Sequence, residues 1–305
     1  MVFICHRFNF SSAVGASSAA SGRRRVLERV DKELSRGNYE SALSLIKQSK
    51  TNPHGLRAFG SVKLVPRKSP FFDINGSNSS ELRSLVDSVV DSIRGCIEST
   101  SADEISSDKR HSKEETGSSS EEPADRFMVV QHESGHFLVG YLLGVLPRRY
   151  EIPKSEALRC NDSTVTGRVE FVGFEFLKEV GIAKQLMKDD VLCKTYQMET
   201  RGKISSKILN SFSCVILGGL VTEHMLLGYS EGLHSDVDKL LSVLRWLGFT
   251  ETEAKSHIRW AASNTAYLLL SHKDAREKLA EAMAMSKSVG YCIETIETAI
   301  FRHQI

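Results

Sequence analysis

The chain has 305 residues, of which 41% are hydrophobic and 26% are charged, so it is long enough to bury the core of one large domain or two smaller ones. Its 40 basic and 38 acidic residues leave a formal net charge of +2, which argues against the global positive field of a nucleic-acid-binding protein. The six cysteines include no Cys-x-x-Cys pair, which argues against both a secreted disulfide framework and a zinc site built from cysteines.

The N-terminal segment, residues 1–22, has the composition of an organelle transit peptide. It contains no acidic residue, it is rich in Ser and Ala, and it carries Arg7, with three further arginines at 23–25. A secretory signal would need a continuous apolar stretch after its basic start. We therefore predict import into the chloroplast, with the mitochondrion as the alternative, although an ordinary disordered N-terminus can have the same composition.

Residues 23–98 are predicted to form a helical N-terminal region. Between about 24 and 48, apolar residues recur at helical spacing on both sides of a Gly-Asn pair at 37–38, which predicts a helical hairpin. Part of this hairpin resembles one tetratricopeptide unit, but no second copy follows, so we interpret it as a packing or docking element. After an irregular connection over 53–80, the apolar spacing predicts a strongly amphipathic helix over 82–97.

Residues 99–125 differ from the segments on either side. They consist mainly of Ser, Glu, Asp, Lys and Thr, with almost no apolar side chains. So little apolar surface cannot offset the entropy lost on ordering, which predicts a disordered, acidic and Ser-rich linker. This linker would separate the N-terminal region from a domain at 126–305.

Residues 126–305 predict a mainly α (α+β) fold with a small β-sheet. A first helix is expected between Pro123 and Pro147, and partial alternation of apolar and polar residues at 165–174 predicts a strand or one arm of a hairpin. Further helices are predicted at about 176–191, 205–227, 235–247, 251–271 and 273–285, with a short helix after 289.

The most apolar stretch, 214–229, is interrupted by Glu223 and His224. No window of about 18 uninterrupted apolar residues occurs in the chain, so we predict a buried helix here and no transmembrane segment. A helix lying against a membrane surface is the alternative, and peripheral membrane association stays open.

A His-Glu-Ser-Gly-His sequence at 132–136 carries the main chemical signal. On a helix, His132 and His136 lie one turn apart on the same face, with Glu133 beside the first of them. Two imidazoles in this arrangement can bind one Zn²⁺ at roughly 2.0–2.1 Å, and the glutamate can act on a water at the metal. The pattern is typical of zincin metallopeptidases, which predicts a helical zincin-like domain.

Two histidines leave zinc one protein ligand short of a catalytic site. A metzincin would have a third histidine where this chain has Leu142, so that class is excluded. A thermolysin-like site would use a downstream glutamate, for which Glu223 is the candidate, and Asp236 is a further possibility. Asp236 could instead be the N-cap of a helix. His224 and His234 are interpreted as packing residues or as partners of the ligands.

Three segments of the chain share an order and spacing with a known family. The His-Glu-Ser-Gly-His at 132–136 resembles the His-Glu-Ala-Gly-His of the peptidase domain of FtsH-type proteases. The Gly-Gly-Leu-Val-Thr-Glu-His at 218–224 looks like that family's Gly-Gly-Arg-x-Ala-Glu-Glu, and 232–237 is similar to its Gly-Ala-Ser-Asn-Asp-Ile/Leu. The resemblance covers approximately 127–294. Since the last aspartate is the third zinc ligand in that family, the resemblance implies this role for Asp236.

The chain departs from the family in two ways. Leu220 stands where the family has Arg, and His224 stands where it has Glu, so the contacts of the second segment need not be kept. The chain also has no Gly-x-x-x-x-Gly-Lys-Ser/Thr loop, and therefore lacks the phosphate-binding signature of the ATPase module. It resembles the short, plant-type FtsH-like proteins that have a peptidase domain after an organelle-targeted N-terminal region.

The resemblance implies a zinc metalloendopeptidase without its own ATPase. His132, His136 and Asp236 would hold Zn²⁺, and Glu133 would be the general base. Protein substrates are the expected partners, with FtsH-type ATPase subunits or a homo-oligomer as further partners and no nucleic acid. The alternative function is a non-catalytic peptidase-like subunit or assembly factor that binds FtsH-type complexes or client proteins. A scaffold with a structural zinc is a third interpretation, but no fourth ligand is evident.

Overall fold

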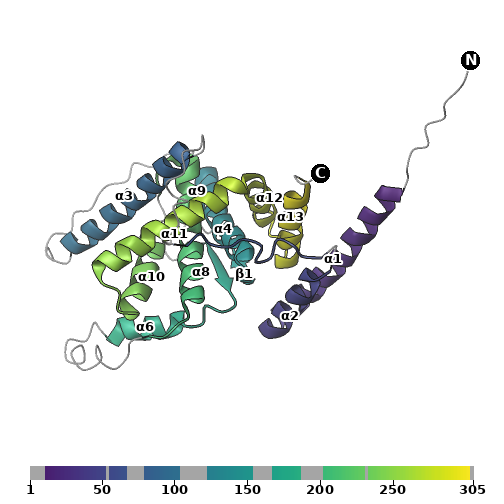
Figure 1. Ribbon diagram of the computed structural model, residues 1–305, viewed down its shortest axis with the longest axis horizontal. Coiled ribbons are helices and arrows are strands. Elements are labelled where there is room, and N and C mark those ends of the chain that lie inside the picture. Colours follow the sequence, from purple (N-terminus) through teal and green to yellow (C-terminus); the bar gives the residue numbers. More distant parts are fainter. Residues whose placement is uncertain are drawn as a thin grey trace, which may run out of the picture.

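Figure 1 shows the chain as a computed structural model, in which helices form almost all of the regular structure. The structure describes residues 11–52, 55–66, 79–103, 122–153, 167–186, 202–230 and 233–302. The mainly α (α+β) fold predicted from the sequence is confirmed. The helices are α1 (Ser11–Ser35), α2 (Tyr39–Lys50), α3 (Ser79–Asp103), α4 (Glu122–Leu142), α6 (Leu177–Leu186), α8 (Ser206–Ile216), α9 (Gly218–Leu227), α10 (Leu233–Trp246), α11 (Glu251–Ser271), α12 (Lys273–Ala284) and α13 (Val289–Arg302), and the strands are β1 (Pro147–Glu151) and β2 (Arg168–Phe171).

The central element is α4, which packs against α8, α9, α12 and both strands. Its apolar side chains at 137–139 and 141–142 have no exposed surface, so their burial fixes this helix in the core. The helix ends in a Schellman turn, in which Gly144 has a φ of 80° and the N–H of Val145 donates to the carbonyl of Gly140 at 2.9 Å. It therefore ends before Pro147, the residue predicted to close it, and Pro147 instead begins β1.

The two strands form an antiparallel sheet that lies against α4. Arg149 pairs with Glu170 and Glu151 pairs with Arg168, so these charged side chains share one face. The other face includes Phe171, which lies so close to Gly140 of α4 that a Cβ there would come within 3.0 Å of the ring. The sequence predicted the strand at 165–174, but it did not predict β1.

The predicted helix at 205–227 is two helices, because the regular helix is interrupted at Leu217 between α8 and α9. The combined stretch Ser206–Leu227 is long and apolar enough to cross a membrane by length and composition, but 78% of its most apolar window is buried inside the fold. This burial confirms the prediction of a buried helix.

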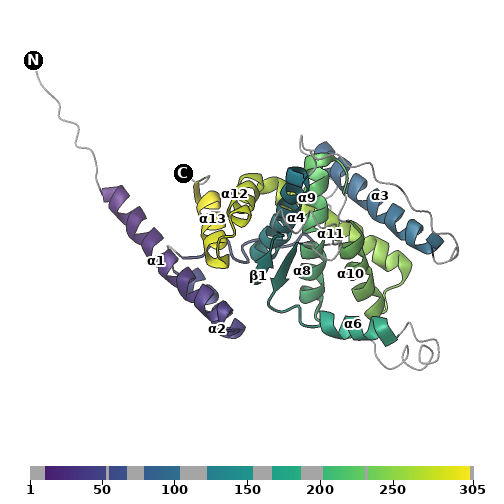
Figure 2. The same cartoon turned by 180° about the vertical axis from the view of Figure 1, so that it is seen from behind.

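The helices α1 and α2 form the predicted hairpin, and the turn between them uses Gly37 with a φ of 77°. The hairpin docks on α13, which lies beside α1 when the molecule is seen from behind (Figure 2). Arg23 Nε donates to Glu294 Oε2 at 2.7 Å, and the N–H of Gly290 donates to Asp31 Oδ1 at 2.7 Å. Residues 1–10 of the predicted transit peptide lie outside the described residues, and 11–22 form the first part of α1.

Residues 55–66, which we call the strap, connect the hairpin region to the end of α4. The N–H of Gly60 donates to the carbonyl of Tyr141 at 3.0 Å, and the N–H of Val62 donates to the carbonyl of Leu142 at 3.2 Å. The strap thus satisfies two of the last carbonyls of α4, which have no partner within the helix. At its start, two N–H groups donate to the buried carboxylate of Glu297 at 3.0 and 2.9 Å.

Helix α3 packs against α9, α10 and α11, so the N-terminal helices share the core of the molecule. The predicted linker at 99–125 lies mostly outside the described residues, since α3 reaches Asp103 and α4 starts at Glu122. The division of the chain into domains stays a prediction.

Candidate metal centre

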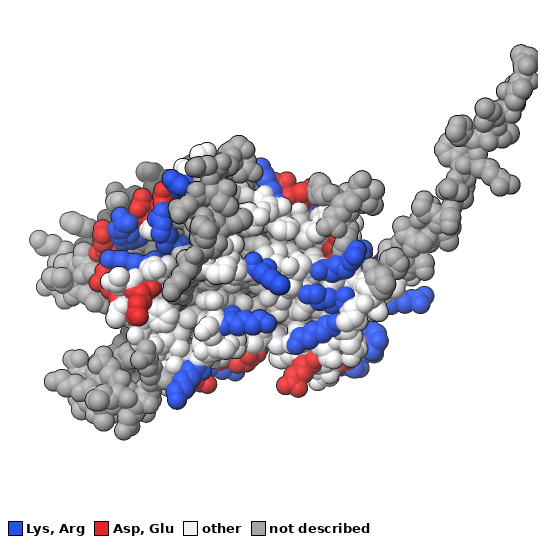
Figure 3. Space-filling model, viewed as in Figure 1, with Lys and Arg blue, Asp and Glu red and all other residues white. Residues whose placement is uncertain are grey.

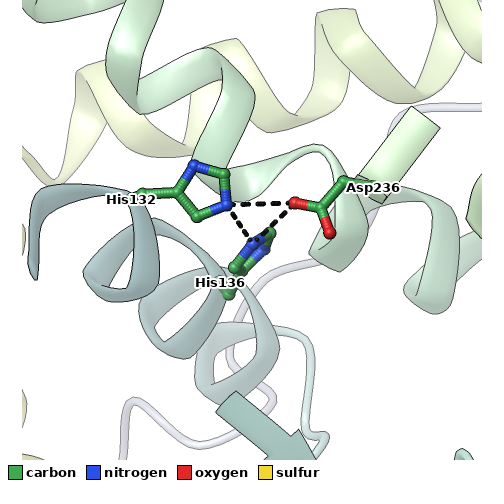
Figure 4. A group of neighbouring side chains, drawn as sticks. All are labelled: His132, His136 and Asp236. Carbon is green, nitrogen blue, oxygen red and sulfur yellow. Dashed lines mark hydrogen bonds and ion pairs between the residues drawn. The ribbon is translucent and has the colours of Figure 1, made fainter. Parts of the chain in front are cut away.

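Two imidazoles and one carboxylate meet at the middle of α4 (Figure 4). His132 and His136 extend from successive turns of α4, and Asp236 comes from the first turn of α10. The two Nε2 atoms are 2.9 Å apart, and each lies 3.0 Å from Oδ2 of Asp236. Among the residues that the structure describes, this is the only group of three His, Cys, Asp or Glu side chains placed to hold a metal ion.

The outer nitrogens of both histidines are held by other groups. His136 Nδ1 donates to the carbonyl of Val215 at 2.7 Å, and since a carbonyl only accepts, this nitrogen carries the proton. His132 Nδ1 lies 2.6 Å from Oε1 of Glu223, whose other oxygen accepts from the hydroxyl of Ser230. Carboxylates and carbonyls in these positions orient the ring and leave Nε2 as the atom that could bind a metal.

The donor set fits a divalent cation. Three donor atoms with edges of 2.9 to 3.0 Å are close to one face of a zinc tetrahedron, whose edges are about 3.3 Å for bonds of about 2.0 Å. Two bare Nε2 lone pairs and a carboxylate oxygen this close repel one another unless a proton or a cation lies between them. Burial alone would lower the pKa of His132, but hydrogen bonds to Asp236 and Glu223 raise it to about 10. The cluster therefore attracts positive charge.

The alternatives left open by the sequence take other positions. Glu223 contacts the outer nitrogen of His132, on the side away from Asp236, so it supports the ring and does not join the donor triangle. The interpretation of Asp236 as a helix N-cap is wrong, because α10 begins at Leu233 and Asp236 lies inside its first turn. Burial alone would raise the pKa of Asp236, but His136 and His132 hold it well below its usual range.

Glu133 lies beside the cluster with a carboxylate that is nearly free of partners. Its side chain is buried and its Oε2 has no hydrogen-bond partner among the described residues. Burial raises the pKa of this carboxyl, although the nearby His136 and His132 lower it. The approach of Gly167 leaves no room for a side chain there, since a Cβ would lie 2.8 Å from Oε1 of Glu133. A glutamate in this state is suited to take up a proton.

The Gly-Gly pair of the second segment has a packing role. A Cβ on Gly219 would come within 3.0 Å of three atoms of the His132 ring, and one on Gly218 would meet the backbone of Gly135 at 2.8 Å. The two glycines therefore let α9 approach α4 closely enough for Glu223 to reach His132.

The residues at the two departures from the family pattern lie outside the donor triangle. Leu220 is buried in the core. His224 is also buried, and its Nδ1 lies 3.0 Å from the hydroxyl of Ser88 on α3, so it acts as a packing residue. Burial lowers its pKa. The side chain of His234 lies outside the described residues.

Several residues at the site were missed by sequence reasoning. Lys239 donates to the remaining oxygen of Asp236 at 3.0 Å, and a spacing of three residues on a helix was a signal that could have found it. Val215 and Gly167 act through contacts between distant segments, and Ser230 reaches Glu223 across the turn that follows α9. No spacing in the sequence indicates these contacts.

Comparisons of the chain with protein-family profiles, with curated proteins and with solved structures found no match. The class of the site therefore rests on its own donor geometry, which is that of a three-ligand His-His-Asp centre with a neighbouring glutamate.

Proposed function

We propose that the chain is a zinc-dependent metalloendopeptidase, FtsH-like but without its own ATPase. The observation that carries the proposal is the donor triangle of His132, His136 and Asp236 with the unpartnered carboxylate of Glu133 beside it. A catalytic zinc site has three protein ligands and an open position, whereas a structural site is closed by four. No fourth His, Cys, Asp or Glu joins the triangle among the described residues.

Each residue has a distinct task in this proposal. His132, His136 and Asp236 would hold the ion through Nε2, Nε2 and Oδ2, and zinc when bound would supply the Lewis acidity for hydrolysis. Glu133 would take a proton from the attacking water on its free Oε2 and pass it to the leaving amine. Glu223 would keep the His132 ring in place by accepting its Nδ1 proton.

The edge of strand β2 lies next to Glu133, where a peptide substrate could bind. In the described part of the chain β2 pairs only with β1, and the strand begins one residue after Gly167, which touches Glu133. An extended peptide can add to an open strand edge by backbone hydrogen bonds. This strand edge supports a polypeptide substrate. The proposal also includes a location in the chloroplast or mitochondrion and ATPase subunits as partners.

The test uses the purified full chain, its metal content by mass spectrometry, and cleavage of casein. The expected result is about one zinc per chain and proteolysis that chelation abolishes. Glu133→Gln should retain zinc but lose cleavage, while the matched change Glu179→Gln on the exposed face of α6 should keep both. Zinc bound with no cleavage by the wild-type chain would instead indicate the non-catalytic subunit, for which the altered second segment is the supporting observation.

A further inference from the structure

Helix α1 and the turn that follows it present a row of four exposed cations, which we call the basic row: Arg25, Arg29 and Lys32 on the helix and Arg36 in the turn. Spacings of four and three residues place the first three on one face of the helix, and Arg36 follows after four more residues, so that the row is about 16 Å long at the usual helical rise. Figure 3 shows Lys and Arg side chains gathered over the α1–α2 hairpin, at the right of the view. The net charge of the whole chain is only +2, so this is a local concentration.

Of the carboxylates nearest to the basic row in sequence, Glu28 and Asp31 are engaged elsewhere, and only Glu33 contacts the row. Asp31 accepts a hydrogen bond from a backbone N–H of α13 at 2.7 Å, Glu33 accepts one from Asn38 at 2.9 Å, and Glu28 pairs with Arg24 at 3.5 Å. Among the described residues no carboxylate lies within 4.0 Å of the first three cations of the row, and the fourth has only Glu33 at 3.4 Å. Three of the four charges of the row are therefore not neutralised by a nearby carboxylate.

The fold also holds the row facing outward. Leu27, Val30 and Leu34 are buried on the opposite side of α1, which packs against α2 and α13. Arg23 points inward and binds Glu294, so it fixes the helix and does not belong to the row. The row lies after residue 22, and removal of the predicted transit peptide would leave it in the mature protein.

We propose that the basic row binds the chain peripherally to an anionic membrane surface. None of the large exposed hydrophobic side chains lies on the described residues of α1 or α2, so this face lacks the apolar anchors of a protein interface. The row contains no aromatic residue on which the bases of a single-stranded nucleic acid could stack. A row along an exposed helix face and the turn after it can meet a plane of lipid phosphates with all four charges. This attraction needs no apolar contact.

The strength of such binding follows from the number of cations. Each Lys or Arg near an anionic bilayer strengthens binding about fivefold, so the four together contribute several hundredfold. The attraction acts over a Debye length of about 8 Å at physiological salt, and it should weaken steeply as salt is added.

The experiment is co-sedimentation of the full chain with vesicles of phosphatidylcholine, with and without phosphatidylglycerol. Only the vesicles with phosphatidylglycerol should bind the wild-type chain. The row variant should bind them several hundredfold more weakly, and Arg29→Gln alone about fivefold more weakly. The row variant carries Arg25→Gln, Arg29→Gln, Lys32→Gln and Arg36→Gln, and the matched control, which loses the same charge from exposed positions on other helices, carries Lys178→Gln, Lys207→Gln, Lys255→Gln and Lys273→Gln.

The control variant should bind the anionic vesicles within a few fold of the wild type. Equal losses in the row variant and the control would overturn the proposal, because net charge alone would then explain the binding. Failure of the wild-type chain to bind anionic vesicles would also overturn it. So would tighter binding to duplex DNA or to polyglutamate at the same salt, which would assign the row to another class of partner. Circular dichroism of both variants checks that the hairpin stays folded.

Discussion

The sharpest test of the site geometry is Gly219→Ala. In most helices an alanine stabilises relative to glycine, by about 0.5–1 kcal/mol, because glycine loses more conformational freedom on folding. At this position the new methyl group would come within 3.0 Å of three atoms of the His132 ring, whereas ordinary Cβ contacts lie at 3.4–4 Å. The ring or α9 would therefore have to move by about 1 Å.

The ring has little freedom to move. His132 is held at 2.6 Å from Glu223 on one side and at 3.0 Å from Asp236 on the other, and a shift of about 1 Å takes a hydrogen bond outside its normal range. Overpacking of this kind costs about 1–3 kcal/mol of stability. Because the displaced ring is a proposed zinc ligand, zinc affinity should fall by at least about 10–100-fold, the usual effect of losing the support of a ligand.

The assays are chemical denaturation of the metal-free chain and zinc titration against a competing chelator. Gly181→Ala on α6 is the matched control, since a Cβ there meets nothing within 4 Å, and it should be neutral or stabilising with unchanged zinc binding. A double-mutant cycle then isolates the contact: in a His132→Ala background, Gly219→Ala should cost little or nothing. If Gly219→Ala is equally destabilising with and without His132, or leaves zinc affinity intact, the proposed packing of α9 under the ligand is refuted.

Three further predictions concern the support of α4 and its ligands. Glu223→Gln should weaken zinc binding about 10–100-fold without unfolding the chain, which a chelator titration would detect, and equal affinity would show that the His132–Glu223 contact is not needed. Glu297→Gln should lower stability by about 1–3 kcal/mol in urea, because its amide group would face an N–H of the strap that the carboxylate now binds. Burial raises the pKa of Glu297 above its ordinary value of 4.5. Protonation of Glu297 therefore stabilises the folded chain, and this stabilisation is complete below pH 4.5 and is lost as the pH rises through the pKa of the folded state. The pH dependence of stability should flatten in Glu297→Gln. Deleting residues 1–66, which removes the strap, should expose the end of α4 and lower the melting temperature, and an unchanged melting temperature would show that the strap contributes nothing.

The parts of the site that could be predicted are those whose residues lie within one or two turns of the same helix. His132 and His136 lie on one face because a helix repeats every 3.6 residues, and this follows from the spacing alone. The helices after residue 176 likewise follow from their apolar periodicity, as does the hairpin that turns at Gly37. Spacing alone did not choose between Glu223 and Asp236, because each is carried to the histidines by a separate helix.

The parts that could not be predicted depend on contacts between distant segments. The strand β1 has only five residues with little alternation, and its pairing with β2 is what makes it a strand. No helix-breaking residue precedes the interruption at Leu217, so the sequence did not indicate it. Gly218 and Gly219 follow it, but they are required by the close approach of α9 to α4 and not by a turn. Local propensity is overridden at such places by packing between elements.

The contacts of the N-terminal region bear directly on how the proposed peptidase should be studied. Tyr141, five residues after His136 on α4, donates its hydroxyl to Glu297 at 2.7 Å, and the same carboxylate accepts two N–H groups of the strap. The strap also satisfies two of the last carbonyls of α4. The position of α4, which carries both histidines, thus depends on α13 and on residues before 67. For this reason metal content and proteolysis are best measured on the full chain, since residues 126–305 alone would lack the contacts of the strap, and loss of activity in that fragment would not distinguish an inactive site from a displaced one.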